Sequence, residues 1–207
     1  MERAASSGSK SRRRREIVRA AVTVFAERGY FSARMRDVAA RADVADGTLY
    51  LYFKGKEDLL VSILEEYADA FLLRARRDVA ACDDPRERLR SVVRRHLVSL
   101  ENDRPLAQVF QIELRHTRRF LRQVAKGRVA GYLALLQEIV ADGVARGCFR
   151  GDIPPEVAAR AVFGAIDELV TAWVLARRPQ PLAAQADALL GLILHGLELQ
   201  RGGGNYG

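Results

Sequence analysis

Apolar side chains recur every three or four residues through most of the chain, which is the period of an α-helix. The first such stripe comprises Ile17, Ala20, Val24 and Phe25, and Gly29 follows it as a helix stop. Alternating Val, Ile and Thr runs bounded by turn residues, which would predict strands, do not occur in the sequence. The pattern therefore predicts an all-α fold of about nine helices.

Turn signals divide this pattern into segments. Asp84 followed by Pro85 predicts an N-cap and the first helical position, and a second break is expected at His116. The best-defined of the predicted helices after the first one cover residues 35–42, 46–53, 56–81, 85–100, 155–177 and 182–200.

The positive charge is concentrated near the N-terminus. Residues 1–56 contain 13 Lys and Arg against 6 Asp and Glu, whereas residues 57–207 contain 21 against 20. A local basic surface attracts polyanions, nucleic acid before anionic membranes. The simpler interpretation, an Arg-rich composition spread over solvated faces, does not explain why the excess accumulates at one end.

The sequence excludes several classes of protein. No stretch approaches the roughly 18 uninterrupted apolar residues of a membrane-spanning helix, and the polar, basic N-terminus leads into no apolar signal segment. Cys82 and Cys148 stand far apart without a Cys-x-x-Cys pattern, so neither a disulfide framework nor a zinc site is predicted. We therefore expect a cytoplasmic protein without a metal or another cofactor.

Residues 35–59 have the pattern of a helix-turn-helix, in which the second of two short helices enters a DNA major groove. On that second helix, Gly47 permits a close approach of the backbone, and Thr48 offers a hydroxyl and a methyl group. Tyr50 and Tyr52 present phenols that reach phosphates or base edges. The segment is therefore a candidate for reading double-stranded DNA.

The same segment resembles the TetR family of bacterial repressors. The family signature Gly-Thr-Leu-Tyr-x-Tyr-Phe-x-x-Lys-Glu-x-Leu stands here over residues 47–59, and the resemblance is close over residues 14–65. Lys56 is expected to hold a phosphate together with the N-terminus of its helix. The resemblance implies that the DNA is lined by Arg36, Gly47, Thr48, Tyr50, Tyr52 and Lys56.

Three positions depart from the family pattern. Ala42-Asp43 replaces the frequent Ala-Gly turn, and the turn is expected to persist because Asp tolerates a left-handed conformation. Ala45 stands where Ser is frequent, so Asp46 is expected to cap the second helix instead. Met35 replaces a frequent Thr and removes one expected phosphate contact.

The predicted domains are a disordered basic arm (1–12), a helix-turn-helix domain (13–56), an effector-binding and dimerisation domain (57–201) and a disordered tail (202–207). The arginines at positions 12–15 have two interpretations, contact with a DNA groove or its phosphates, or a solvated basic tail. The last two helices carry apolar faces. Two such hairpins from two protomers would close a four-helix bundle, and a two-fold dimer predicts a palindromic operator.

In TetR-type proteins the second domain binds a small effector. Basic side chains at helical spacing and apolar side chains along several helices would together suit a long acyl chain that carries phosphates, that is, an acyl-coenzyme A. The simpler interpretations are a solvated basic face and ordinary core packing. The candidate effector-binding residues are Phe110, Arg115, Arg118, Arg119, Arg122, Lys126, Tyr132, Phe163 and Trp173.

Strings at residues 111–115, 131–133 and 163–173 are similar to the fatty-acid-degradation (FadR-type) regulators within the TetR family. This similarity implies a repressor of fatty-acid-degradation genes that long-chain acyl-CoA releases from its operator. One alternative is a TetR-type repressor with another apolar effector, such as a drug in multidrug efflux control. Another is an enzyme of acyl-CoA metabolism, which no catalytic constellation supports, since His96, His116 and His195 stand apart.

Overall fold

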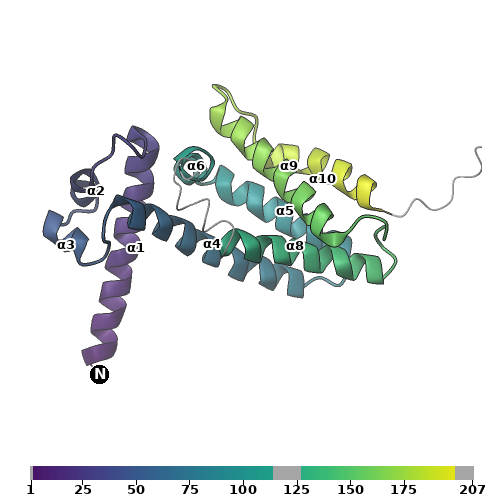
Figure 1. The fold of residues 1–207 in the computed structure, drawn as a ribbon, viewed down its shortest axis with the longest axis horizontal. Helices are drawn as coiled ribbons and strands as arrows, with labels where there is room; N and C mark the ends of the chain where they lie inside the picture. The colour runs from purple at the N-terminus through teal and green to yellow at the C-terminus, as the bar shows by residue number, and fades with distance from the viewer. Residues whose placement is uncertain (1, 114–126, 199–207) are drawn as a thin grey trace, which may run out of the picture. The chain divides into compact units, whose positions relative to one another are not determined.

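The computed structural model describes residues 2–113 and 127–198. Within these ranges the chain forms nine α-helices and one π-helix, and the β-type pairing is an isolated bridge between Phe149 and Glu198 (Figure 1). The all-α prediction is confirmed. No helix in the described ranges is long and apolar enough to cross a membrane.

The chain divides into two compact units. The first unit comprises Met1–Asp69 and Asp103–Val124, and the second comprises Ala70–Asn102 and Ala125–Gly207. This division does not follow the boundary expected after residue 56, because the first part of the long fourth helix and the segment from Asp103 onward cluster with the N-terminal helices.

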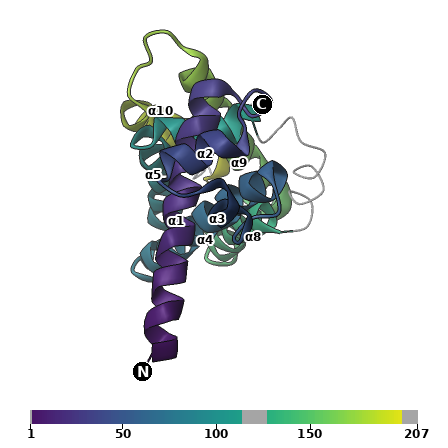
Figure 2. The same ribbon diagram turned by 90° about the vertical axis from the view of Figure 1, so that its left-hand side faces the viewer.

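The first unit is built around α1. This helix packs against α2, α6 and the π-helix η1. α2 packs in turn against α3 (Figure 2). Its buried core includes Ile17, Phe25, Val38 and Leu49. The elements are α1 (Glu2–Arg28), α2 (Met35–Arg41), α3 (Asp46–Tyr50), the beginning of α4 (Lys56–Ala80), α6 (Arg104–Gln108) and η1 (Val109–Glu113).

The expectation of a disordered arm over residues 1–12 is wrong for residues 2–12, because α1 begins at Glu2 and continues past α2 and α3 (Figure 2). The segment contains no proline to end a helix. Arg12 and Arg13 both pair with Glu16 one turn further on, at 3.8 Å and 2.8 Å, and such pairs support a helix. The predicted tail, 202–207, lies outside the described residues.

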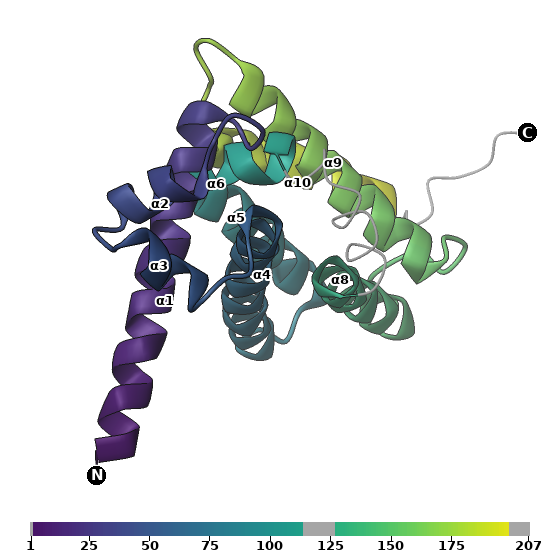
Figure 3. The ribbon, with the colours of Figure 1, turned by 60° about the vertical axis from the view of Figure 1, so that its left-hand side comes forward.

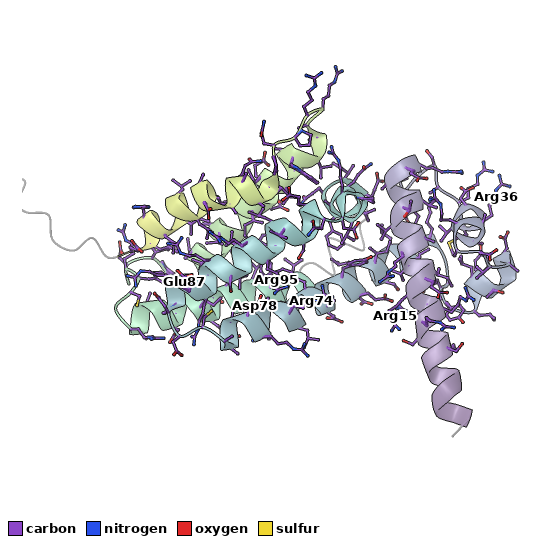
Figure 4. The ribbon with its side chains drawn as sticks, turned by 180° about the vertical axis from the view of Figure 1, so that it is seen from behind. Arg15, Arg36, Arg74, Asp78, Glu87 and Arg95 are labelled. Atoms are coloured by element: carbon purple, nitrogen blue, oxygen red, sulfur yellow. The ribbon has the colours of Figure 1, made fainter. Side chains whose placement is uncertain are left out.

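The second unit holds the end of α4 and four further helices, α5 (Pro85–Glu101), α8 (Arg128–Ala145), α9 (Pro155–Leu175) and α10 (Leu182–Leu197). α8 packs against α9 and α5, and α10 packs against α5 and α9 (Figure 3). Asp84 caps α5 as predicted, since its carboxylate accepts the Arg86 N–H at 2.9 Å. Asp78 on α4 pairs with Arg95 on α5 (Figure 4).

Gly143 on α8 lies against the ring of Phe149, which is 1% exposed. A Cβ atom at residue 143 would come within 2.1 Å of Phe149 Cδ2. We therefore expect Gly143→Ala to lower the free energy of unfolding by about 1–3 kcal/mol through overpacking. In a Phe149→Ala background the same change should raise it by about 0.5–1 kcal/mol, the ordinary gain of Ala over Gly in a helix. Urea unfolding of the four proteins tests this, and an equal effect in both backgrounds would contradict it.

Candidate functional site

The turn between α2 and α3 has the conformation that the sequence predicts. Asp43 adopts φ = +53°, in the left-handed region, and the Val44 N–H donates to the carbonyl of Ala39 at 3.0 Å. The expectation that Asp46 caps α3 is wrong, since α3 begins after Ala45 without a side-chain cap. A helix-turn-helix is thus present, with a short second helix.

The second helix has one buried and one exposed side. Leu49 and Phe53 are 0% and 1% exposed and anchor the segment in the core of the first unit. Tyr50 is 57% exposed, and a Cβ atom at Gly47 would meet nothing within 4 Å. The exposed side is therefore open to a groove of DNA.

The remaining DNA candidates lie around this side. Thr48 and Tyr52 are half-buried, and Arg36 is exposed on α2 (Figure 4). The structure adds Lys54, an exposed residue between α3 and α4 that is not among the DNA contacts predicted from the sequence. Lys54 stands at one of the positions written x in the family signature, where a basic side chain could have been noted as a candidate for phosphate contact. Contact of these residues with DNA stays a prediction.

The ammonium of Lys56 is hydrogen-bonded within the protein, and its contact with a phosphate stays a prediction. Its ammonium donates to three backbone carbonyls of the segment between α1 and α2: Tyr30 at 2.5 Å, Phe31 at 3.1 Å and Ala33 at 3.0 Å. The same nitrogen stands 4.5 Å from the centroid of the Tyr30 ring, and burial lowers the pKa of Lys56. An ammonium has three donors, so this arrangement occupies all of them within the protein.

Arg14 is likewise engaged within the first unit. Its guanidinium lies 5.1 Å from the centroid of the Phe53 ring and pairs with Glu66 on α4. Of the two interpretations of arginines 12–15, neither describes Arg14, which packs on the helix-turn-helix core. Asp37 supports the start of α2 by accepting the Arg34 N–H at 2.9 Å, and this bond, followed by Arg28, lowers the pKa of the carboxyl.

In the second unit the structure brings together two of the predicted effector-binding residues. The rings of Tyr132 on α8 and Phe163 on α9 stand edge to face, with centroids 5.7 Å apart. Phe71 and His96 complete the cluster, with centroids 5.1 Å and 5.3 Å from that of Tyr132. The sequence predicts no partner for His96, because no local pattern connects it to a residue 36 positions away.

The polar atoms of this aromatic cluster face each other. His96 Nδ1 lies 3.1 Å from the hydroxyl of Tyr132, which is 6% exposed. Burial lowers the pKa of His96 to about 4, against a smaller opposing effect of Asp167. Burial also raises the pKa of the Tyr132 phenol. Both side chains are therefore neutral at pH 7.

The other effector candidates are not part of this cluster as described. Phe110 belongs to the first unit, where its ring packs edge to face on Tyr67 at 6.5 Å. Trp173 is buried on α9. Five basic candidates lie outside the described residues: Arg115, Arg118, Arg119, Arg122 and Lys126.

A helix-turn-helix with an exposed second helix in a basic N-terminal segment defines a DNA-binding protein. The chain belongs to the TetR family of bacterial regulatory proteins, whose family description matches residues 17–63. Residues 64–196 match the family described as the C-terminal region of YsiA-like proteins. The relatives described next include a transcriptional repressor and a transcriptional regulator.

Known proteins resemble the chain along most of its length. It is 37% identical to the fatty acid metabolism regulator protein of Bacillus subtilis over 182 residues, 88% of this chain and 94% of that protein. A crystal structure of FadR from B. subtilis in complex with stearoyl-CoA matches with a TM-score of 0.83 and 36% identity, covering 87% and 97% of the two chains. The transcriptional repressor KstR2 of Rhodococcus jostii is 30% identical over 92% of this chain and 94% of its own.

Lys54 and Lys56 form a matched pair for separating DNA contact from folding. We expect Lys54→Ala to weaken operator binding, to reduce the slope of log affinity against log salt by about 1, and to leave stability within about 0.5 kcal/mol. Lys56→Ala should lower the free energy of unfolding by about 1–3 kcal/mol, because three carbonyls lose their donor. If Lys56→Ala changed only the salt slope, Lys56 would bind phosphate as the family signature implies.

The lowered pKa of His96 predicts a pH-dependent stability. The pKa of His96 is 6.5 in the unfolded chain and about 4 in the folded chain. As the pH falls below 6.5, the unfolded chain therefore binds a proton at His96 that the folded chain binds only near pH 4. The free energy of unfolding therefore falls by up to about 1.4 kcal/mol per pH unit in that window from this residue. Urea unfolding between pH 7 and pH 5 should show a shallower loss for His96→Gln than for the wild type. Equal slopes, or an NMR pKa near 6.5, would contradict the assignment.

Proposed function

We propose that the protein is a TetR-type repressor of fatty-acid-degradation genes and that a long-chain acyl-CoA releases it from a palindromic operator. The observation that carries this proposal is the similarity, along nearly the whole chain, to a fatty acid metabolism regulator whose structure contains stearoyl-CoA. The surface around the second helix supports the DNA-binding part, through Gly47, Thr48 and Tyr50 on α3. Tyr52, which follows α3, and Arg36 on α2 belong to the same proposed contact set.

Two features of the chain support an acyl-CoA effector. Five basic side chains between residues 115 and 126 would offer charge to the phosphates of coenzyme A, and they directly precede α8 in the sequence. α8 carries Tyr132, whose aromatic cluster provides apolar surface with a neutral polar pair inside it. An acyl chain with one carbonyl group has the same combination of a large apolar and a small polar surface.

A homodimer through α9 and α10 fits the exposed apolar side chains of these helices. Val157 and Leu175 on α9 are 52% and 67% exposed, and Leu192 on α10 is 75% exposed. A two-fold dimer would present two second helices to one palindrome. We also propose a cytoplasmic location and a regulatory rather than enzymatic role, because the named relatives act on transcription.

Operator release tests the proposal directly. A palindromic duplex selected from a random pool by the wild-type protein is labelled, and its dissociation constant is measured by fluorescence anisotropy. We expect micromolar stearoyl-CoA to raise this constant by about tenfold or more, within the usual range of coupling between two sites. Stearate and coenzyme A alone should leave it unchanged.

The outcomes separate the two parts of the proposal. Failure to select any duplex would contradict DNA binding. Tight binding that stearoyl-CoA does not weaken would contradict the effector and favour a TetR-type repressor with another apolar ligand. Turnover of stearoyl-CoA by the purified protein would contradict the regulatory role.

A further inference from the structure

The backbone of Tyr30, two residues after the end of α1, is hydrogen-bonded through both its N–H and its carbonyl. The Tyr30 N–H donates to Glu113 Oε2 at 2.7 Å, and its carbonyl accepts from Lys56 Nζ at 2.5 Å. One turn earlier, Gln108 Nε2 donates to the carbonyl of Ala26 at 2.7 Å. The end of α1 is therefore tied to α4, α6 and η1 by hydrogen bonds within the first unit.

Glu113 is suited to this bond by burial and by backbone geometry. Its side chain is 7% exposed, and a buried carboxylate is costly unless donors face it. Gly29 has φ = +74°, which turns the chain so that the following amide meets the carboxylate. A Cβ atom at Gly29 would lie 3.8 Å and 4.0 Å from the two carboxylate oxygens. The Tyr30 N–H is thus a donor that faces this buried carboxyl group.

Glu113 also connects two parts of the sequence. It lies within residues 64–196, which match the C-terminal region of the family, yet it clusters with the helix-turn-helix in the first unit. The candidate basic residues for the effector begin two positions after it, at Arg115. A change in the conformation of η1 would therefore act directly on Glu113.

The π-helix provides a way to make such a change. η1 spans Val109–Glu113 and ends on Glu113 itself. A π-helical turn holds one residue more than an α-helical turn and occurs often at functional sites. Its conversion to α-helix shifts the register by one residue and rotates the side chains that follow by about 100°. Such a rotation would remove Glu113 from the amide of Tyr30.

We propose that Glu113 is the positioning residue that couples the effector to the DNA-binding state. Its hydrogen bond to Tyr30 is made when the helix-turn-helix binds DNA and is absent when the effector is bound. This inference rests on the proposed function, in which acyl-CoA binding and operator binding exclude each other. Glu113 touches neither DNA nor effector in this scheme and acts through the segment that joins α1 to α2.

The proposal has a thermodynamic signature that a purely structural role lacks. Removing a bond made only in the DNA-binding state shifts the population toward the effector-binding state. Glu113→Ala should therefore weaken operator binding about tenfold and tighten stearoyl-CoA binding, two changes of opposite sign. A residue that merely stabilised the fold would weaken operator binding without tightening the effector.

The experiment compares four full-length proteins by operator anisotropy and stearoyl-CoA calorimetry. Glu113→Gln keeps an oxygen that accepts the Tyr30 N–H and should stay within about threefold of the wild type on both measurements. Glu101→Ala is the matched control, since the Glu101 carboxylate accepts a backbone N–H at 2.8 Å from Ala183 in the second unit. It should change neither affinity by more than about twofold.

Hydrogen exchange of the Tyr30 amide gives a readout that needs no effector. The amide proton of Tyr30 should be protected from exchange in the wild type and in Glu113→Gln. It should exchange faster in Glu113→Ala. If stearoyl-CoA fails to release the wild type, the proposed function is contradicted. If it releases the wild type but Glu113→Ala binds stearoyl-CoA no more tightly than the wild type does, the coupling role is overturned.

Discussion

The ammonium of Lys56 is the interaction on which the helix-turn-helix depends. The segment between α1 and α2 presents three carbonyls that point toward one place, and without a donor these dipoles would repel one another and require water. Lys56 supplies three donors from the first position of α4. The position of α2, and through it that of α3, therefore follows from where α4 begins.

The burial of Phe53 and Leu59 explains why Lys56 lies in this place. Both side chains are fully buried on either side of it, at 1% and 0% exposure. They fix the backbone between α3 and α4, so the lysine stem has a short, defined path to the α1–α2 segment. The Tyr30 ring, which packs on Phe25 at 5.6 Å, covers the ammonium from one side. The packing of these side chains thus places the ammonium beside the three carbonyls, and the ammonium then donates a hydrogen bond to each of them.

The sequence predicted local structure well because local chemistry determines it. Asp43 takes the left-handed conformation that few residues tolerate, and Asp84 caps α5, since each outcome depends on a residue and its near neighbours. Lys56 shows the limit. A lysine in that signature is attracted by phosphate oxygens and by carbonyl oxygens alike, and spacing along the chain does not distinguish them. Likewise, the contact of His96 with Tyr132 arises from the packing of α5 against α8, which no sequence period records.

These contacts also change the meaning of the basic N-terminal segment. Several of its cations are neutralised inside the first unit, since Arg14 pairs with Glu66, Arg28 with Asp37 and Arg41 with Glu27. The charge that attracts DNA at long range is a property of the whole segment, because distant phosphates respond to net charge. Direct contact with DNA is a prediction for a smaller set of cations, which includes the exposed Arg36 and Lys54. Net charge therefore explains the attraction of this surface for DNA, whereas the ion pairs lower the number of its cations that lack a carboxylate partner.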